Sequence, residues 1–317
     1  MTAATGVAPH GFCHSAVLYD TDEELLAVAV PFLTDGARAG QPTILALDEE
    51  RTALITAALG PTEGIEVVPA AGRPDRPALA IQSFLTRFEQ LVAEGATQIR
   101  VLGNIPVPEP PGAWQPWARY EAYSNQAFAS FPLWGMCVFD TRTSPAHVLD
   151  DARRTHTHLA TPHAHAENDR FEDPAAFLEA HMDFEDDPLQ AHRPVADLID
   201  PRPAQARHAV DHAAAGGRVE GERLDGLIIA VSEVVTNAVV HGRPPVEVRA
   251  WTEPDRIVVT VADGGTGPVD PTVGLAPVPR LPGEGGLGLW IANQLCDEVA
   301  LRKRDDGFTI RLTARAR

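Results

Sequence analysis

Glu-Val-Val-Thr-Asn-Ala-Val-Val-His, residues 233–241, is the stretch that decides the fold of the C-terminal half of the chain. Apolar residues in and before it recur at three- and four-residue spacing, which predicts a helix over 222–241 with one apolar stripe. The stripe consists of Leu227, Ile228, Val231, Val234, Val235, Ala238 and Val239. Glu233, Asn237 and His241 stand four residues apart, so they line up on another face of the helix. A carboxylate, a carboxamide and an imidazole on one rigid face suit a base, a Mg²⁺ ligand and a phosphate contact.

Two glycine-rich stretches follow this helix. Asp263-Gly-Gly-Thr-Gly267 comes directly after an apolar run that predicts a strand over 257–262. Gly283-Glu-Gly-Gly-Leu-Gly288 leads into a predicted helix at 286–296, so its backbone N–H groups would face a bound phosphate. Together with the helix over 222–241, the two stretches predict a split nucleotide pocket.

Length and composition limit the classes of protein to which the chain can belong. At 317 residues the chain is long enough for two domains, each with its own core. With 44% hydrophobic and 22% charged residues it resembles a soluble protein, and no apolar run approaches the roughly 20 residues of a membrane helix. The start lacks a signal peptide and three scattered cysteines fit a reducing compartment, so we expect a cytoplasmic protein. The formal charge of −18 argues against direct nucleic-acid binding and favours a protein or small-molecule partner.

The N-terminal half alternates short apolar runs with helical patterns from Ser15 to about Ala152. The predicted strands are 16–19, 43–47, 66–68, 98–102 and 133–139, and the predicted helices are 22–38, 49–59, 77–94 and 115–130. Such alternation indicates right-handed βαβ units and a three-layer domain around a parallel sheet.

Residues 153–193 change character, since a histidine-rich stretch gives way to acidic residues with little apolar periodicity. They predict a linker with one short helix. Beyond it, the pattern predicts helices at 203–215, 222–241 and 286–296 and strands at 246–251, 257–262, 298–302 and 308–313. Helices on one face of a mostly antiparallel sheet are the simplest packing of that order.

The order of these C-terminal elements resembles the Bergerat-type (GHKL) ATPase fold, an α/β sandwich shared by anti-sigma-factor serine kinases, sensor histidine kinases, gyrase and MutL. Anti-sigma kinases of the RsbW and SpoIIAB type carry Glu-x-x-x-Asn-Ala on a helix, Asp-x-Gly-x-Gly after a strand and Gly-x-Gly-x-Gly-Leu in a later loop. The matching positions are Glu233, Asn237, Ala238, Asp263, Gly265, Gly267, Gly283, Gly285, Gly286 and Gly288. The resemblance implies an ATPase domain over 195–317.

In such a domain the carboxylate of Asp263 accepts the exocyclic amine of adenine, which selects ATP over GTP. Gly265 and Gly267 let the backbone approach the base. The phosphate-facing residues are Gly283, Gly285, Gly286, Leu287 and Gly288. The proline-rich stretch 268–282 predicts either a flexible lid over ATP or a solvated connector.

The polar face of the helix carries the chemistry. By resemblance Asn237 is the Mg²⁺ ligand. Glu233 is the expected catalytic base, the alternative being that it orders water or caps a neighbour. His241 either contacts the nucleotide or simply ends the helix, with Gly242 as its cap.

The resemblance implies an ATP- and Mg²⁺-dependent protein serine/threonine kinase that sequesters a sigma factor, phosphorylates an anti-anti-sigma (STAS) protein and forms a homodimer. One alternative is a switch in which ATP occupancy gates partner binding without phosphotransfer. Another is a sensor histidine kinase component. The stretch 153–193 is too short and irregular for the two-helix dimerisation module that precedes the ATPase domain of histidine kinases.

The N-terminal domain, placed at 1–155 with a linker over 156–194, resembles the MEDS sensory domain, a RecA-like module. The stretches that carry this resemblance are His14-Ser-Ala-Val-Leu-Tyr19, Phe139-Asp-Thr-Arg142 and Ala152-Arg-Arg-Thr-His156. Asp20-Thr-Asp-Glu-Glu24 stands where RecA-type ATPases have their phosphate-binding loop. Because acidic residues repel phosphate, we expect a sensor or a docking module rather than a second ATPase.

Two groups in the N-terminal half have metal-ligand chemistry. Cys13, His14 and Cys137 meet if the first and last strands adjoin, which gives either a metal or redox site or small buried core side chains. The other group is His156, His158, His163 and His165. These histidines either bind Zn²⁺ or Ni²⁺ or belong to a solvated linker that senses pH.

Overall fold

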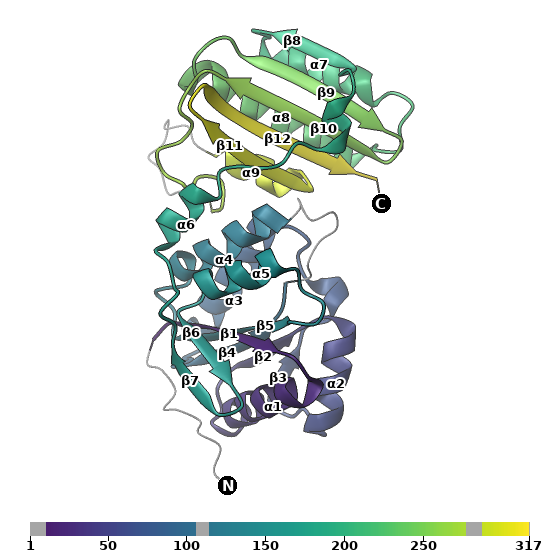
Figure 1. The fold of residues 1–317 in the computed structure, drawn as a ribbon. Coiled ribbons are helices and arrows are strands. Elements are labelled where there is room, and N and C mark those ends of the chain that lie inside the picture. The colour runs from purple at the N-terminus through teal and green to yellow at the C-terminus, as the bar shows by residue number, and fades with distance from the viewer. Residues whose placement is uncertain (1–10, 106–113, 277–286, 317) are drawn as a thin grey trace. The chain divides into compact units, whose positions relative to one another are not determined.

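The computed structural model describes residues 11–105, 114–276 and 287–316. The chain divides into two compact units, residues 1–74 with 80–177 and residues 75–79 with 178–317. Each unit is built around its own sheet (Figure 1). The mixed α/β fold with a parallel and an antiparallel sheet, as predicted from the sequence, is confirmed.

The first unit contains a seven-stranded sheet with the order β3-β2-β4-β5-β1-β6-β7. All neighbouring strands run parallel except β6 and β7, which form an antiparallel hairpin. The strands are β1 (Cys13–Tyr19), β2 (Thr43–Ala46), β3 (Ile65–Val67), β4 (Ile99–Gly103), β5 (Leu133–Asp140), β6 (His158–Thr161) and β7 (Ala164–Glu167). The helices are α1 (Asp22–Arg38), α2 (Glu49–Leu59), α3 (Pro77–Ala93), α4 (Gln115–Ala127), α5 (Ala146–Thr155) and α6 (Pro174–Ala180).

Successive strand residues point to opposite faces of the sheet, and each face has its own helical layer. Leu45 and Leu102 pack in the cluster that includes α1 and α2, whereas the neighbouring Ile44 and Val101 pack in the cluster that includes α3. Figure 1 shows α1 and α2 on one side of the sheet and α3, α4 and α5 on the other. The three-layer prediction is therefore confirmed.

The histidine-rich stretch is part of this sheet and not the linker expected from its composition. Strand β6 pairs in parallel with β1, Ser15 opposite His158, and the β6–β7 hairpin extends the sheet by two strands. The acidic stretch that follows packs on the second sheet: Arg302 contacts Asp186 at 2.8 Å and Arg256 contacts Asp187 at 3.0 Å. The composition did not predict the hairpin or the packing of the acidic stretch, because strands at or next to the edge of a sheet and salt-bridged segments lack an apolar periodicity.

The second unit contains an antiparallel sheet with the order β11-β12-β10-β9-β8. Its strands are β8 (Ala196–Ile199), β9 (Glu247–Glu253), β10 (Arg256–Asp263), β11 (Glu298–Arg304) and β12 (Gly307–Arg315). Helices α7 (Pro203–Ala214), α8 (Glu222–His241) and α9 (Gly288–Leu295) pack together with one face of the sheet around a common core. This is the predicted sandwich, with the edge strand β8 as the one strand of the unit that the sequence did not suggest.

Helix α8 is the central helix of this core. Among the described helices it is the one with the length and composition of a membrane span. Of its predicted apolar stripe, Leu227, Val231, Val234 and Val235 are nevertheless completely buried against the antiparallel sheet and the neighbouring helices, whereas Val239 is exposed. The buried stripe fixes the rotation of α8 and so decides where its polar face points.

Candidate functional site

The polar face of α8 is the first part of the candidate site. Glu233 and Asn237 are half-buried, one helical turn apart, whereas His241 is exposed at the last helical residue. The N–H of Gly242 caps the helix by donating to the carbonyl oxygen of Ala238 at 3.0 Å. The structure therefore brings Glu233 and Asn237 together and leaves His241 at the end of the helix.

The start of α9 lies directly against this polar face. A methyl group added to Gly288 would stand 3.0 Å from both Oε2 of Glu233 and Nδ2 of Asn237. Such a contact is tighter than most Cβ contacts in proteins, so a side chain at this position would push against both polar groups. Because the first N–H groups of a helix have no partner within the helix, the contact places backbone donors next to a carboxylate and a carboxamide.

Asp263, the last residue of β10, forms the second part of the site. Its Oδ1 accepts the backbone N–H of Gly265 at 2.7 Å and that of Arg243 at 3.2 Å. Among the described residues, no group donates to Oδ2. One carboxylate oxygen thus holds the turn together while the other keeps its capacity to accept a hydrogen bond.

The glycines after Asp263 are required by two different constraints. A side chain at Gly265 would stand 2.6 Å from Oδ1 of Asp263, so it would displace the carboxylate. Gly267 has a φ of +70° and its Cα faces the ring of Phe308, so a side chain there would be both strained and obstructed. Both glycines therefore keep the turn after β10 free of side chains that would disturb the carboxylate of Asp263 or clash with Phe308.

The described part of the proline-rich stretch, residues 268–276, packs against α9. Leu275 is buried, and a side chain at Gly274 would meet Leu289 and Asn293 of that helix. Of the predicted phosphate-facing residues, Gly283, Gly285 and Gly286 lie outside the described residues. Leu287 is exposed immediately before α9.

The donor set suits a magnesium-bound nucleotide. Asn237 offers an amide oxygen and Glu233 a carboxylate, which are the hard oxygen ligands and the base that such a site needs. The N–H groups at the start of α9 supply donors for phosphate oxygens. The free Oδ2 of Asp263 suits an amine donor on the base.

Comparisons with known proteins identify both units. Residues 13–157 match the model of the MEDS domain, described as the methanogen/methylotroph, DcmR sensory domain. Residues 199–314 match that of the histidine kinase-like ATPase domain.

Among curated proteins, the serine-protein kinase RsbW of Bacillus velezensis is 37% identical over 106 residues, and that of Bacillus licheniformis is 39% identical over 103 residues. Each match covers 28% of this chain and 63% of the relative, so the chain spans less than two thirds of these proteins. A solved structure of the RsbU and RsbW domains of a Mycobacterium tuberculosis protein aligns with 20% identity and a TM-score of 0.26, over 39% of this chain and 33% of that one.

Proposed function

We propose that this chain, which joins a MEDS domain at its N-terminus to a histidine kinase-like ATPase domain at its C-terminus, is an ATP-dependent protein serine/threonine kinase of the anti-sigma type. It binds ATP with Mg²⁺ in the second unit, sequesters a sigma factor, and phosphorylates a hydroxyl of an anti-anti-sigma protein with a STAS domain. The MEDS domain modulates these activities. The similarity to two RsbW kinases supports the proposal.

One observation carries the proposal: a Cβ placed on Gly288, at the start of α9, would lie 3.0 Å from Oε2 of Glu233 and 3.0 Å from Nδ2 of Asn237, so both side chains adjoin the start of that helix. A nucleotide whose phosphates lie at the start of α9 therefore has a base and a metal ligand beside its phosphate chain. The adenine would reach Asp263, which is held at the end of a strand of the same core.

The residues then have separate tasks in the transfer. Glu233 accepts the proton of the incoming serine or threonine hydroxyl while the hydroxyl oxygen bonds to the γ-phosphorus. The bond from that phosphorus to the bridging oxygen breaks, and ADP leaves with the electron pair. Bound Mg²⁺ would neutralise charge on the phosphate oxygens, and Asn237 is the residue that would hold it.

Replacing Asn237 by alanine is expected to remove most of the gain in ATP affinity that Mg²⁺ provides, about tenfold, because an amide oxygen ligand is lost. Titration calorimetry with and without Mg²⁺ measures this difference. Thr236→Ala is the matched control: Thr236 is the exposed neighbour on the same helix, and its hydroxyl donates only to the carbonyl of Ser232. An unchanged Mg²⁺ effect in Asn237→Ala would reject the metal-ligand role.

The kinase proposal itself is tested by incubating the chain with γ-labelled ATP, Mg²⁺ and a candidate STAS-domain protein. Acid-stable label on the partner supports the proposal. ATP binding without any label indicates a nucleotide-gated switch, and acid-labile label on this chain indicates a histidine kinase component; either result contradicts the proposal.

Two further parts of the proposal concern assembly and location. We propose that the chain forms a homodimer through its ATPase domain and acts in the cytoplasm. Exposed apolar side chains, Ile199 at the end of β8 and Val239 and Val240 near the end of α8, support an interface on this domain. Light scattering over a range of concentrations tests the dimer.

A further inference from the structure

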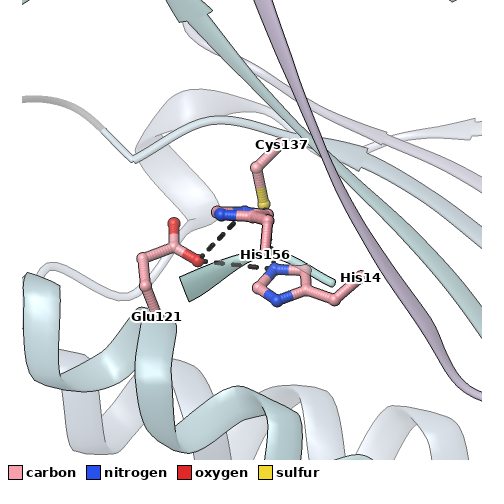
Figure 2. A group of neighbouring side chains, drawn as sticks. All are labelled: His14, Glu121, Cys137 and His156. Carbon is pink, nitrogen blue, oxygen red and sulfur yellow. Dashed lines mark hydrogen bonds and ion pairs between the residues drawn. The ribbon is translucent and has the colours of Figure 1, made fainter. Parts of the chain in front are cut away.

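Four side chains with metal-ligand chemistry converge inside the MEDS domain. His14 on β1 and Cys137 on β5 share a face of the sheet, because these parallel strands are neighbours and pair Ala16 with Cys137. Glu121 on α4 and His156 at the end of α5 reach the same point from the helical layer (Figure 2). One ligand atom from each residue lies within 4.8 Å of all the others.

The spacing of the donor atoms is that of a tetrahedral metal site. Nε2 of His14 lies 3.4 Å from Oε2 of Glu121 and 3.5 Å from Sγ of Cys137, and Nε2 of His156 lies 3.6 Å from Oε2 of Glu121. Zn²⁺ bonds of about 2.0 to 2.3 Å at tetrahedral angles place neighbouring ligand atoms about 3.3 to 3.7 Å apart. These three separations fall in this range, and the remaining pairs of ligand atoms lie within 4.8 Å of each other.

The tautomer of His156 leaves its Nε2 able to bind a metal. Nδ1 lies 2.8 Å from the carbonyl oxygen of Ala152, so it must carry the hydrogen. The nearby hydroxyl of Thr155 cannot substitute as a donor to Nδ1, because it donates to the carbonyl of Asp151 at 2.8 Å. In a neutral ring Nε2 then has a lone pair, and it points into the cluster.

The tautomer of His14 is also fixed, again with the hydrogen on Nδ1. The Nδ2 group of Asn125 donates to the carbonyl oxygens of Thr155, Glu121 and Ala122, so the amide orientation is determined and Oδ1 faces His14. Nδ1 of His14, 3.3 Å from that oxygen, must donate. Histidines that ligate metals commonly donate their other N–H to such a carbonyl or amide oxygen.

Burial makes the cluster costly without a cation. Glu121 is 1% exposed, and within the described part of the chain neither of its oxygens accepts a hydrogen bond. Because His14 and His156 carry their ring hydrogen on Nδ1, each could donate to Glu121 from Nε2 only as a charged imidazolium ion. Two such hydrogen bonds would therefore require two buried imidazolium ions. His156 is itself completely buried, so charging its ring would also be costly.

We propose that His14, Glu121, Cys137 and His156 bind one divalent transition-metal ion of the Zn²⁺ class through two Nε2 atoms, a carboxylate oxygen and a thiolate. Mixed nitrogen, sulfur and oxygen ligands in tetrahedral spacing favour Zn²⁺ over the hard cations Mg²⁺ and Ca²⁺. Burial and the nearby Glu121 raise the pKa of the Cys137 thiol, so the metal must displace its proton on binding. The proposal does not depend on kinase activity.

The opposite face of β1 offers a matched control. Cys13, one residue before His14, points to the other side of the sheet, where its Sγ lies 3.5 Å from Nδ1 of His158. His158 and His165 stack with ring centroids 5.0 Å apart on that side, and His163 is exposed. The four histidines of the histidine-rich stretch therefore do not form one site, and only His156 belongs to the proposed one.

The test measures metal in the full-length protein, both as purified and after equilibration with Zn²⁺ and dialysis, by inductively coupled plasma mass spectrometry. We expect about one Zn²⁺ per chain, and Co²⁺ substitution should give tetrahedral d–d bands with a thiolate-to-cobalt charge-transfer band. Cys137→Ser should abolish the charge-transfer band and weaken Zn²⁺ affinity at least about 100-fold. Cys13→Ser should leave both properties unchanged.

Glu121→Gln and His156→Gln provide a second set of variants, each checked for folding by circular dichroism. Chelation of the wild-type metal should lower the unfolding temperature of the protein, and the shift should vanish in the folded variants. Failure of the folded wild-type protein to retain Zn²⁺ would overturn the proposal, as would a cobalt spectrum without the charge-transfer band. An equal loss of metal in Cys13→Ser and Cys137→Ser would also overturn it.

Discussion

Replacing Glu233 by glutamine is expected to lower the rate of phosphate transfer by about 10² to 10⁴, the usual contribution of a general base, while ATP affinity changes little. Glutamine keeps the length of the side chain beside Gly288, where the close contact with α9 leaves little room for another shape. It cannot accept the hydroxyl proton. The effect should therefore appear in the transfer step and not in nucleotide binding.

Single-turnover transfer to the partner protein and calorimetric ATP binding separate the two effects of Glu233→Gln. Glu222→Gln is the control, because Glu222 lies at the exposed beginning of the same helix and away from Gly288. Transfer that stays within a factor of three of the wild-type rate would show that Glu233 orders water or caps a neighbour.

Replacing Asp263 by asparagine is expected to weaken ATP binding about 10- to 150-fold, which corresponds to the roughly 1.5 to 3 kcal/mol of a hydrogen bond to a charged group. The substitution keeps an oxygen for the N–H groups of Gly265 and Arg243, so the turn is retained. It replaces the free Oδ2 by an NH₂ group, and two donors then oppose each other at the exocyclic amine of adenine. The preference for ATP over GTP should fall with the affinity.

Calorimetry with ATP and GTP measures both changes in Asp263→Asn. Asp270→Asn is the matched control, since Asp270 also accepts the N–H two residues later, from Thr272 at 2.8 Å, but is exposed. Equal effects in the two variants, or an unchanged ATP affinity in Asp263→Asn with an intact circular dichroism spectrum, would contradict the adenine role.

Much of the fold was predictable because each element carries its own periodicity. Helices α1, α2 and α8 begin and end at the predicted residues, since all three start with an acidic turn and α1 and α8 also carry an apolar stripe. The β6–β7 hairpin was not predictable. Its place in the sheet depends on pairing with one edge of β1 while β5 pairs with the other edge, and such long-range pairing cannot be read from a local pattern.

The two candidate sites also differ in how far they could be predicted from the sequence. Glu233, Asn237 and Asp263 could be proposed as site residues from the sequence, because a motif records their spacing along the chain. Glu121 carries no such signal: it lies on an ordinary amphipathic helix, and only the packing of α4 over β1 and β5 brings it to His14 and Cys137. In the structure, Glu121 is one of several buried polar residues of α4. Their burial would have been a hint, but exposure cannot be read from the sequence.

On the proposed function, the two oxygens of Asp263 link nucleotide recognition to the folding of the second unit. One oxygen closes the turn after β10, so the other acquires its position only when that turn and the surrounding sheet have formed. An unfolded chain then lacks the affinity for adenine that the turn provides, so ATP binding adds RT ln(1 + c/Kd), where c is the ATP concentration, to the stability of the native state. At a concentration 100 times the dissociation constant, this linkage amounts to about 2.7 kcal/mol. On the proposed function, nucleotide supply would therefore set the lifetime of the protein as well as its activity.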